Sequence, residues 1–309
     1  MPSNTAFPAV APVSPARAQA SSAIVPISVL IAVRNEVKNL GRCLEPLQGW
    51  ADEVVVVDSQ SSDGTIELAQ AAGATVVQFH YQGGWPKKRQ WALETHGWKN
   101  DWILLLDADE ILLPEVKAEI AAAIRDEQYA GYWLQFQIVF LGRMLRHGDT
   151  RLWKRCLFRR GRGRYERRLE QQDARMADME VHEHVVVEGP TRRLCSPVRH
   201  ENWNSLHRYI EKHNEYSTWE ANVQLYGSDD ELRPSLFGTQ AQRRRWLKRT
   251  FMRLPGAPWL RFLYVYVFRM GFLDGRAGLT YAMFKMVQSF HVKAKVRELQ
   301  QAEQLPDRR

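Results

Sequence analysis

The stretch that decides the fold is Trp102-Ile103-Leu104-Leu105-Leu106-Asp107-Ala108-Asp109-Glu110, an apolar run that ends in three carboxylates. The apolar part is too short for a membrane-spanning helix and has the length of one buried strand. The acids then lie at the carboxyl end of that strand, where open α/β sheets bind their ligands. Asp107 and Asp109 are two residues apart, so their oxygens are candidate ligands for Mg²⁺ or Mn²⁺. A solvated acidic turn after a core strand is the alternative interpretation.

Three further apolar runs precede this stretch, at residues 27–33, 53–58 and 74–79, and segments with helical spacing separate them. This alternation predicts an α/β fold in which a mostly parallel, Rossmann-like sheet is flanked by helices. Polar residues follow the first two runs, at Arg34 to Glu36 and at Asp58-Ser59. Because parallel strands end at one edge of a sheet, these turns predict a single ligand crevice. The sequence contains neither a dinucleotide-binding glycine fingerprint nor a Walker A motif.

A basic cluster, Lys87-Lys88-Arg89, follows Gly83-Gly84-Trp85-Pro86 in the first turn of a predicted helix. Cations at a helix N-terminus oppose the macrodipole by about 0.3–1 kcal/mol each, so the cluster requires an explanation. An anionic ligand, attracted by the helix amides and the basic side chains, is one explanation. A solvated basic face is the other.

The bulk composition predicts an anionic partner, because the 309 residues carry a formal charge of +8 and a pI near 9.5. Three scattered cysteines, at positions 43, 156 and 195, argue against a disulfide framework or zinc site and fit a reducing cytoplasm. Residues 1–23 are rich in Ala, Pro and Ser and predict a disordered tail. Prolines interrupt every apolar block of that tail, so we expect no signal peptide.

Four blocks, in this order, resemble the inverting family 2 glycosyltransferases with the GT-A fold: Ile27 to Glu36, Val57 to Thr65, Gly84 to Arg89, and Asp107-Ala108-Asp109. They cover residues 25–125. The acidic turn, taken with the later Val181-His182-Glu183, resembles the lipopolysaccharide core-type glucosyltransferase subgroup. The C-terminal half of the chain resembles that subgroup less sharply.

The resemblance implies a nucleotide-sugar donor, with UDP as the nucleotide, and a divalent metal, Mg²⁺ or Mn²⁺. The pocket for base and ribose would lie after the first strand, the uracil ring would bind the acid that ends the second, and the basic cluster would face the diphosphate. Asp107 would reach ribose or metal, and Asp109 would ligate the metal. The implied donor-binding residues are Ala32, Arg34, Glu36, Asp58, Ser59, Lys88, Arg89, Asp107 and Ala108.

Glu183 is the carboxylate that we expect to take the proton of the acceptor hydroxyl, with His182 orienting it or binding the acceptor. The family places this base on a segment after the Asp-x-Asp motif. Glu110 and Asp178 are alternative bases. Two other interpretations of this segment stay open, a metal site formed by His182 and His184 and an ordinary polar start of a strand.

The C-terminal half has several basic tracts. Ten Arg or Lys residues lie between positions 151 and 175, where they predict either a solvated face or a site for a phosphorylated or acidic acceptor. Residues 200–216 predict a helix whose histidines serve packing. Residues 259–272 are aromatic and apolar but contain Arg261 and Arg269, which predicts a helix lying in an anionic membrane interface. A buried helix packed on the catalytic domain is the alternative.

Together these features predict a disordered tail at 1–23, a GT-A domain at 24–225 and a basic amphipathic helical region at 226–309. Within the domain, residues 24–125 would bind the nucleotide sugar and 126–225 the acceptor. We expect a cytoplasmic glycosyltransferase, peripheral on the inner face of the membrane, that moves a hexose to a lipid-linked or lipopolysaccharide-core-type saccharide. The alternatives are a nucleotidyltransferase acting on sugar phosphates and a non-enzymatic nucleic-acid binder, although no nucleic-acid-binding motif is visible.

Overall fold

The computed structural model describes residues 24–169, 183–202, 204–227, 235–237, 243, 246–247, 250–251 and 254–304. The predicted tail at 1–23 lies outside this range. The strands of the main sheet are β1 (Val25–Val33), β2 (Ala51–Asp58), β3 (Thr75–Gln78), β4 (Trp102–Asp107), β5 (Glu110–Ile111), β6 (Gly131–Phe140), β7 (Arg143–Met144), β8 (Arg151–Arg159) and β11 (Thr191–Glu201). A second, two-stranded sheet consists of β9 (Gly163–Tyr165) and β10 (Val185–Val187).

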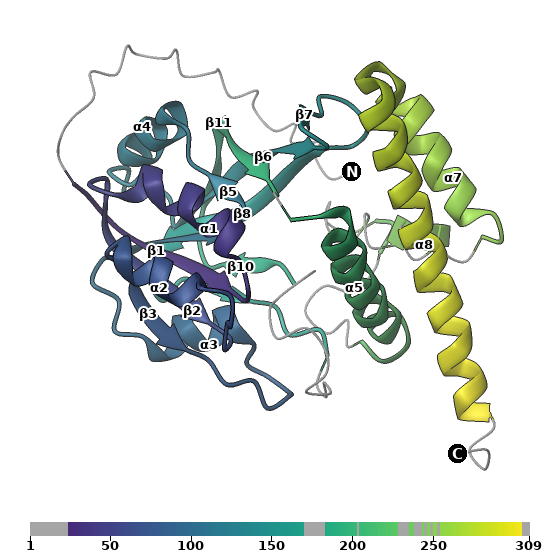
Figure 1. The fold of residues 1–309 in the computed structure, drawn as a ribbon, viewed down its shortest axis with the longest axis horizontal. Helices are drawn as coiled ribbons and strands as arrows, with labels where there is room; N and C mark the ends of the chain where they lie inside the picture. The colour runs from purple at the N-terminus through teal and green to yellow at the C-terminus, as the bar shows by residue number, and fades with distance from the viewer. Residues whose placement is uncertain are drawn as a thin grey trace, which may run out of the picture.

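The N-terminal half of the sheet has the order β3-β2-β1-β4, and all of its neighbouring strands are parallel. Its connections are the helices α1 (Val37–Leu44), α2 (Thr65–Ala71) and α3 (Lys88–Thr95). In β4 the five residues of the run Trp102 to Leu106 are all at most 4% exposed, as a strand covered on both faces requires. The predicted α/β class is therefore confirmed, and β1, β2 and β4 all end at the same edge of the sheet (Figure 1).

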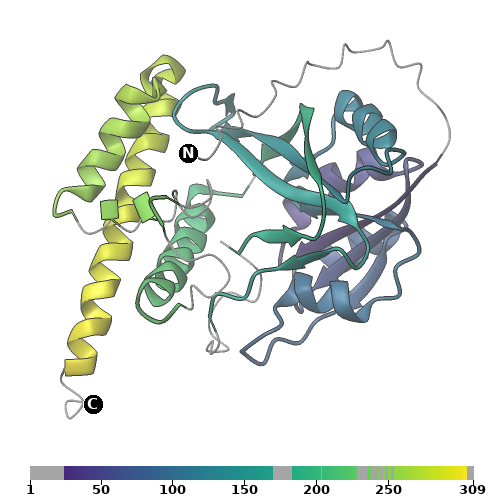
Figure 2. The same cartoon turned by 180° about the vertical axis from the view of Figure 1, so that it is seen from behind.

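The second half extends the sheet in the order β4-β8-β6-β11-β5. Here β8 is antiparallel to both β4 and β6, whereas β11 is parallel to β6 and antiparallel to the short β5. Because β5 directly follows the acidic turn, its pairing with β11 brings residue 200 beside residue 110. Helix α4 (Pro114–Ala123) packs against β11. Figure 1 shows α1, α2 and α4 over the near face of the sheet, and Figure 2 shows the strands from the opposite side.

The C-terminal helices stand beside the sheet rather than over it (Figures 1 and 2). They are α5 (Leu206–Tyr226), α7 (Ala257–Leu263) and α8 (Gly275–Gln304), and α8 packs against both of the others. The predicted amphipathic segment at 259–272 is not one helix, because a π-helical turn η2 (Tyr264–Phe268) and a 3₁₀ turn η3 (Gly271–Asp274) follow α7. Met270 between these turns has a φ of 57°, a left-handed conformation that an α-helix cannot contain. Among the described helices, none is both long enough and apolar enough to cross a membrane.

A small second core joins the sheet to these helices. Its buried residues are Phe140 at the end of β6, Leu145 after β7, Val265 in η2, and Ala277, Tyr281 and Ala282 in α8. The loop after the hairpin is held to the same region, since the Gly148 amide donates to the Arg269 carbonyl at 2.8 Å. A side chain at Gly271 would place its Cβ 2.8 Å from the Val265 carbonyl oxygen, so this close approach requires glycine.

His213 gives this packing a pH dependence. Its ring stacks on Tyr209 with centroids 3.9 Å apart, and its Nδ1 donates to the Tyr209 carbonyl at 2.8 Å. Burial lowers the pKa of His213 to about 4, and the charges of Lys285 and Lys212 act in the same direction. Between pH 6.5 and 4 the unfolded chain therefore binds more protons at this site, so stability falls as the pH falls, by up to about 1.4 kcal/mol per pH unit.

We expect His213→Gln to lose less stability than the wild type between these pH values, because glutamine does not titrate. Urea unfolding of both proteins at several pH values measures the difference. Carboxylates contribute equally to both curves, so parallel curves would contradict the role of His213.

Candidate active site

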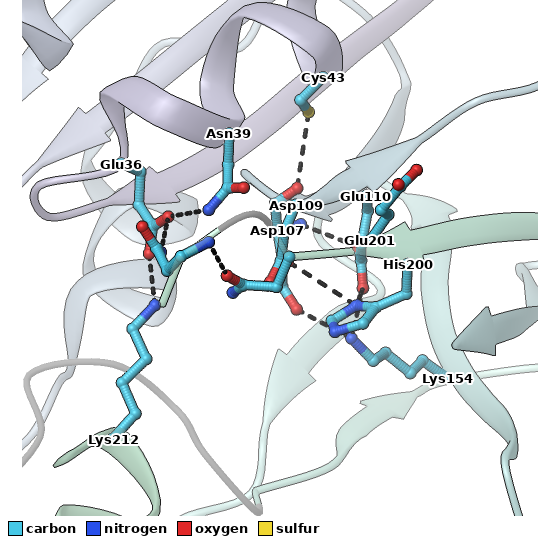
Figure 3. Close-up of polar contacts among 12 residues, drawn as sticks. Glu36, Asn39, Cys43, Asp107, Asp109, Glu110, Lys154, His200, Glu201 and Lys212 are labelled. Atoms are coloured by element: carbon cyan, nitrogen blue, oxygen red, sulfur yellow. Dashed lines mark hydrogen bonds and ion pairs between the residues drawn. The ribbon is translucent and has the colours of Figure 1, made fainter. Parts of the chain in front are cut away.

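The acidic turn after β4 forms an ion-pair cluster rather than a solvated loop. Asp107 accepts from Arg89 of α3 through Oδ1 and from Lys154 of β8 through Oδ2 at 2.9 Å. The Glu110 carboxylate accepts from the Asp107 amide at 2.8 Å and from Lys154 Nζ at 2.5 Å (Figure 3). Burial alone would raise the pKa of Asp107, but the charges of Lys154 and Arg89 outweigh it and hold that pKa well below its usual range.

Glu110 is 1% exposed, and both of its carboxylate oxygens accept hydrogen bonds within the cluster. Burial and the neighbouring charge of Asp107 raise its pKa. Burial would lower the pKa of Lys154, but Asp107 and Glu110 raise it further than burial lowers it. Lys154 was one of ten basic residues in a tract, and nothing in the sequence distinguished it. The antiparallel pairing of β8 with β4 places it here.

Asp109 lies opposite His200, the second functional candidate that the sequence missed. The register of β11 on β5 pairs His200 with Glu110, and the Nδ1 atom of His200 lies 3.7 Å from Asp109 Oδ1 and 3.6 Å from Glu110 Oε1 (Figure 3). Asn202 donates to the other Asp109 oxygen at 2.7 Å. Burial would lower the pKa of His200, but the charges of Asp109 and Glu110 raise it to about 9. The sequence had suggested a packing role for the histidines of this segment, and His200 differs.

Asp107, Asp109 and His200 could together hold a divalent cation. One ligand atom from each of them lies within 4.8 Å of the others. The Nδ1 atom of His200 is buried and lies beyond hydrogen-bond distance of the Asp109 and Glu110 carboxylates, and the ring would lose its proton on binding a metal. Two carboxylates suit Mg²⁺ or Mn²⁺, and an imidazole favours Mn²⁺ over Mg²⁺. The residues present therefore fit the predicted metal.

The predicted base and ribose pocket lies beside this cluster, after β1. Ala32 is buried, Arg34 is exposed, and Glu36 is 7% exposed. The Glu36 carboxylate forms an ion pair with Lys212 of α5 and accepts from Asn39 at 2.7 Å (Figure 3). It also accepts from Asn204 at 3.2 Å. The ion pair with Lys212 thus joins α5 to the turn after β1, a contact that no local sequence pattern indicated.

Asp58 and Ser59 end β2 at the same edge. The Asp58 carboxylate accepts from the Ser61 amide at 2.9 Å and from the Gln78 side chain at 3.1 Å, and it is fully buried. The Ser59 hydroxyl is buried and lacks a hydrogen-bond partner among the described residues. These contacts fix the Asp58 side chain at the end of β2.

The basic cluster at the start of α3 is buried, so its interpretation as a solvated face is wrong. Lys87 and Lys88 are fully buried and Arg89 is 5% exposed. Lys88 Nζ donates to the Val33 carbonyl at the end of β1, at 2.8 Å, and Arg89 pairs with Asp107. The cluster therefore joins α3 to the carboxyl ends of β1 and β4, where the predicted diphosphate would lie.

Glu183, the predicted base, forms a buried ion pair with Lys87. The distance from Lys87 Nζ to Glu183 Oε1 is 2.7 Å, and both side chains are fully buried. Lys87 also lies 5.1 Å from the centre of the Trp219 ring of α5. His182 and the alternative base Asp178 lie outside the described residues. The structure thus places Glu183 next to the basic cluster.

Comparison with known protein families now adds to this geometry. The model of the family "Glycosyl transferase family 2" matches residues 28–185, just over half of the chain. A lipopolysaccharide core biosynthesis glycosyltransferase, LpsC of Rhizobium meliloti, is 30% identical over 282 residues, which are 88% of this chain and 92% of that protein. An uncharacterized glycosyltransferase of Rickettsia bellii is 37% identical over 125 residues, and the match spans only 40% of each chain.

The solved structures are less similar. Staphylococcus aureus TarS, residues 1–349, aligns with 89% of this chain and 91% of its own, at 16% identity and a TM-score of 0.40. A score below 0.5 contributes nothing to the assignment of this chain. The match to the family model and the long alignment to LpsC are the findings that decide it.

Proposed function

This chain belongs to glycosyl transferase family 2, and from that premise we propose that it transfers a hexose from a UDP-sugar, with a divalent metal, to a saccharide acceptor. The chain is a glycosyltransferase; the donor, the metal and the acceptor are the proposal. The observation that carries it is the convergence of Asp107, Asp109 and His200 at the strand edge that also presents Asp58 and Glu36. We do not propose the nucleotidyltransferase or the nucleic-acid binder, because the family is one of glycosyl transfer.

The donor would bind along the carboxyl ends of β2, β1 and β4, which are neighbours in the sheet. Ala32, Arg34 and Glu36 would line the base and ribose pocket, with Asp58 on the uracil N–H, since an ionised carboxylate only accepts hydrogen bonds. The Ser59 hydroxyl would supply one further polar contact. Lys88 and Arg89 would face the diphosphate, next to Asp107 and Ala108.

The metal would be held by Asp109 and His200, with Asp107 as a third ligand. When bound, Mn²⁺ or Mg²⁺ would neutralise the charge that develops on the departing diphosphate. Arg89 and Lys154 already contact Asp107, so they hold its carboxylate in one orientation. Lys154 and Arg89 would add positive charge on the same side of the site.

Glu183 would act as the base. It would accept the proton of the acceptor hydroxyl while that oxygen forms its bond to the anomeric carbon and the bond to the diphosphate breaks. One in-line displacement inverts the anomeric centre. Lys87 fixes the position of the Glu183 carboxylate, with His182 as the expected neighbour of the acceptor.

The acceptor would be a lipid-linked or lipopolysaccharide-core-type saccharide. LpsC supports this proposal, because it aligns over nearly the whole chain and its name places it in lipopolysaccharide core biosynthesis. Such an acceptor resides at a membrane, so the C-terminal region would bring the enzyme to the inner face of the cytoplasmic membrane.

A thermal-shift panel tests the donor and metal. We expect UDP with Mn²⁺ to raise the melting temperature more than ADP, GDP or CDP with Mn²⁺, because a ligand that binds only the folded state stabilises it. Mn²⁺ alone and UDP alone are the controls, and each should give the smaller shift. Equal shifts with all four diphosphates would contradict the uracil role of Asp58, and no shift with any of them would contradict the donor class.

A further inference from the structure

The C-terminal helices expose an apolar surface that packing within the described chain does not cover. On α8, Leu279, Met283, Val287 and Phe290 follow one another at helical spacing, and each is at least 37% exposed. At 1.5 Å per residue this stripe is about 17 Å long. It lies on the helix whose other faces contact α5 and α7.

The segment before α8 adds more exposed apolar side chains. Trp259 is 67% exposed and Phe268 is 76% exposed. Thirteen of the twenty-three large apolar side chains that are exposed in the described residues lie between positions 259 and 290. The other members of this set are Leu260, Leu263, Tyr264, Val267, Met270, Phe272 and Leu273. A concentration of this size marks an interaction site.

A basic cavity of about 380 Å³ adjoins this surface, between the β6–β7 hairpin with its following loop and the turn η3. It is lined by Arg143, Met144, Arg146, His147, Leu273 and Asp274. Leu273 belongs to both features, so the cavity opens beside the apolar side chains. Leu141, at the tip of the hairpin, is a further exposed apolar side chain, at 55%.

The charge in this cavity is not neutralised from within the described chain. Asp274 is 3% exposed, and its carboxylate accepts from the backbone amides of Arg146 and His147 at 3.0 and 2.8 Å. It therefore orders the loop, and its only side-chain partner among the described residues is His147, at 3.3 Å. The guanidinium groups of Arg143 and Arg146 have no ion-pair partner in the described part of the chain. Both guanidinium groups can therefore bind an anion from outside the chain.

We propose that residues 259–290 and the hairpin form one membrane-docking surface, with a lipid phosphate bound by Arg143 and Arg146 in the basic cavity. An anionic bilayer matches both halves of this surface, because aromatic and aliphatic side chains insert at the boundary of headgroups and acyl chains while arginines bind phosphates. Arg269 and Arg276, both exposed, add positive charge at the same end. The inference rests on the proposed function only in that the acceptor is expected at a membrane.

Vesicle co-sedimentation tests the proposal. We expect the wild type to bind vesicles that contain phosphatidylglycerol more tightly than pure phosphatidylcholine vesicles. Arg143→Gln combined with Arg146→Gln should weaken binding to the anionic vesicles roughly 30-fold, since each arginine near an anionic surface contributes ~1 kcal/mol. The matched control is Arg125→Gln with Arg162→Gln, which removes the same charge from exposed positions of the catalytic half.

A second variant tests the apolar half. Phe268→Ser with Phe272→Ser should weaken binding to both kinds of vesicle, and folding is preserved because both side chains are exposed. Equal binding by the arginine variant and its control, or equal binding of the wild type to neutral and anionic vesicles, would overturn the proposal. If inorganic phosphate raises the melting temperature of the wild type but not of the arginine variant, and vesicles do not bind, the cavity takes a free phosphate and the lipid source is wrong.

The outcome is separable from that of the proposed function. The arginine variant should keep the full stabilisation by UDP with Mn²⁺, because the cavity lies on the hairpin and not at the ends of β1, β2 and β4. If UDP with Mn²⁺ does not stabilise the wild type, the donor proposal is contradicted, and the result with vesicles is unaffected.

Discussion

Asp109→Ala should abolish hexose transfer, with a loss of roughly 10³-fold or more, while the protein stays folded. The carboxylate would hold a metal ion whose charge stabilises the transition state by several kcal/mol. Each 1.4 kcal/mol changes the rate about tenfold. The substitution also removes the negative charge beside His200, and it removes the oxygen that accepts the hydrogen bond from Asn202. Transfer rates and Mn²⁺ binding by electron paramagnetic resonance measure the two consequences separately.

The control is Asp101→Ala, at the opposite end of β4. Asp101 is 76% exposed and pairs with Arg160 at the surface, so its loss removes the same charge without touching the site. Melting temperatures of both variants should lie close to that of the wild type. Metal-dependent turnover by Asp109→Ala at a rate near that of the Asp101 control would show that the metal is held elsewhere. His200→Asn should also weaken Mn²⁺ binding, which extends the test to the histidine ligand.

Glu183→Gln should remove turnover and also destabilise the fold. A glutamine cannot take the proton, and it breaks the buried ion pair with Lys87, a change that costs about 3–5 kcal/mol. Lys87→Met should destabilise the protein in the same way, from the other side of the pair. Urea unfolding gives the stability, and transfer at a temperature where every variant is folded gives the activity.

The double variant Lys87→Met/Glu183→Gln separates the two roles of Glu183. Because it removes both charges, its loss of stability should be smaller than the sum of the single losses. Its activity should remain absent if Glu183 is the base. Recovery of turnover together with stability would show that Glu183 only supports the fold, and wild-type turnover by Glu183→Gln alone would place the base elsewhere. UDP-induced stabilisation should persist in the folded variants.

The sequence predicted the N-terminal half of the fold well because the signals there are local. Each of β1, β2 and β4 is an apolar run that ends in a polar turn, and burial on both faces leaves the chain little alternative to a parallel sheet. The same logic predicted that Asp58, Asp107 and Asp109 lie at one edge of the sheet, since the carboxyl ends of such strands meet there, and the structure places them at that edge.

The partners of these residues were beyond the reach of local patterns. Lys154, His200 and Lys212 come from segments far along the chain, and many other basic residues and histidines look the same in the sequence. The basic cluster at 87–89 was identified, but its burial was not, because burial depends on what packs over a helix. The division of residues 259–272 into the end of α7 and the turns η2 and η3 likewise follows from tight contacts with the loop after the hairpin.

By itself, then, the sequence determined the α/β class and the edge of the sheet where Asp58, Asp107 and Asp109 lie. These depend on the periodicity of apolar residues and on where each run ends. The tertiary structure alone decided which charges meet. Strand pairing sets Lys154 on Asp107 and His200 beside Asp109, and helix packing sets Lys212 on Glu36. Such contacts depend on register and on long-range packing, which no single segment of sequence specifies.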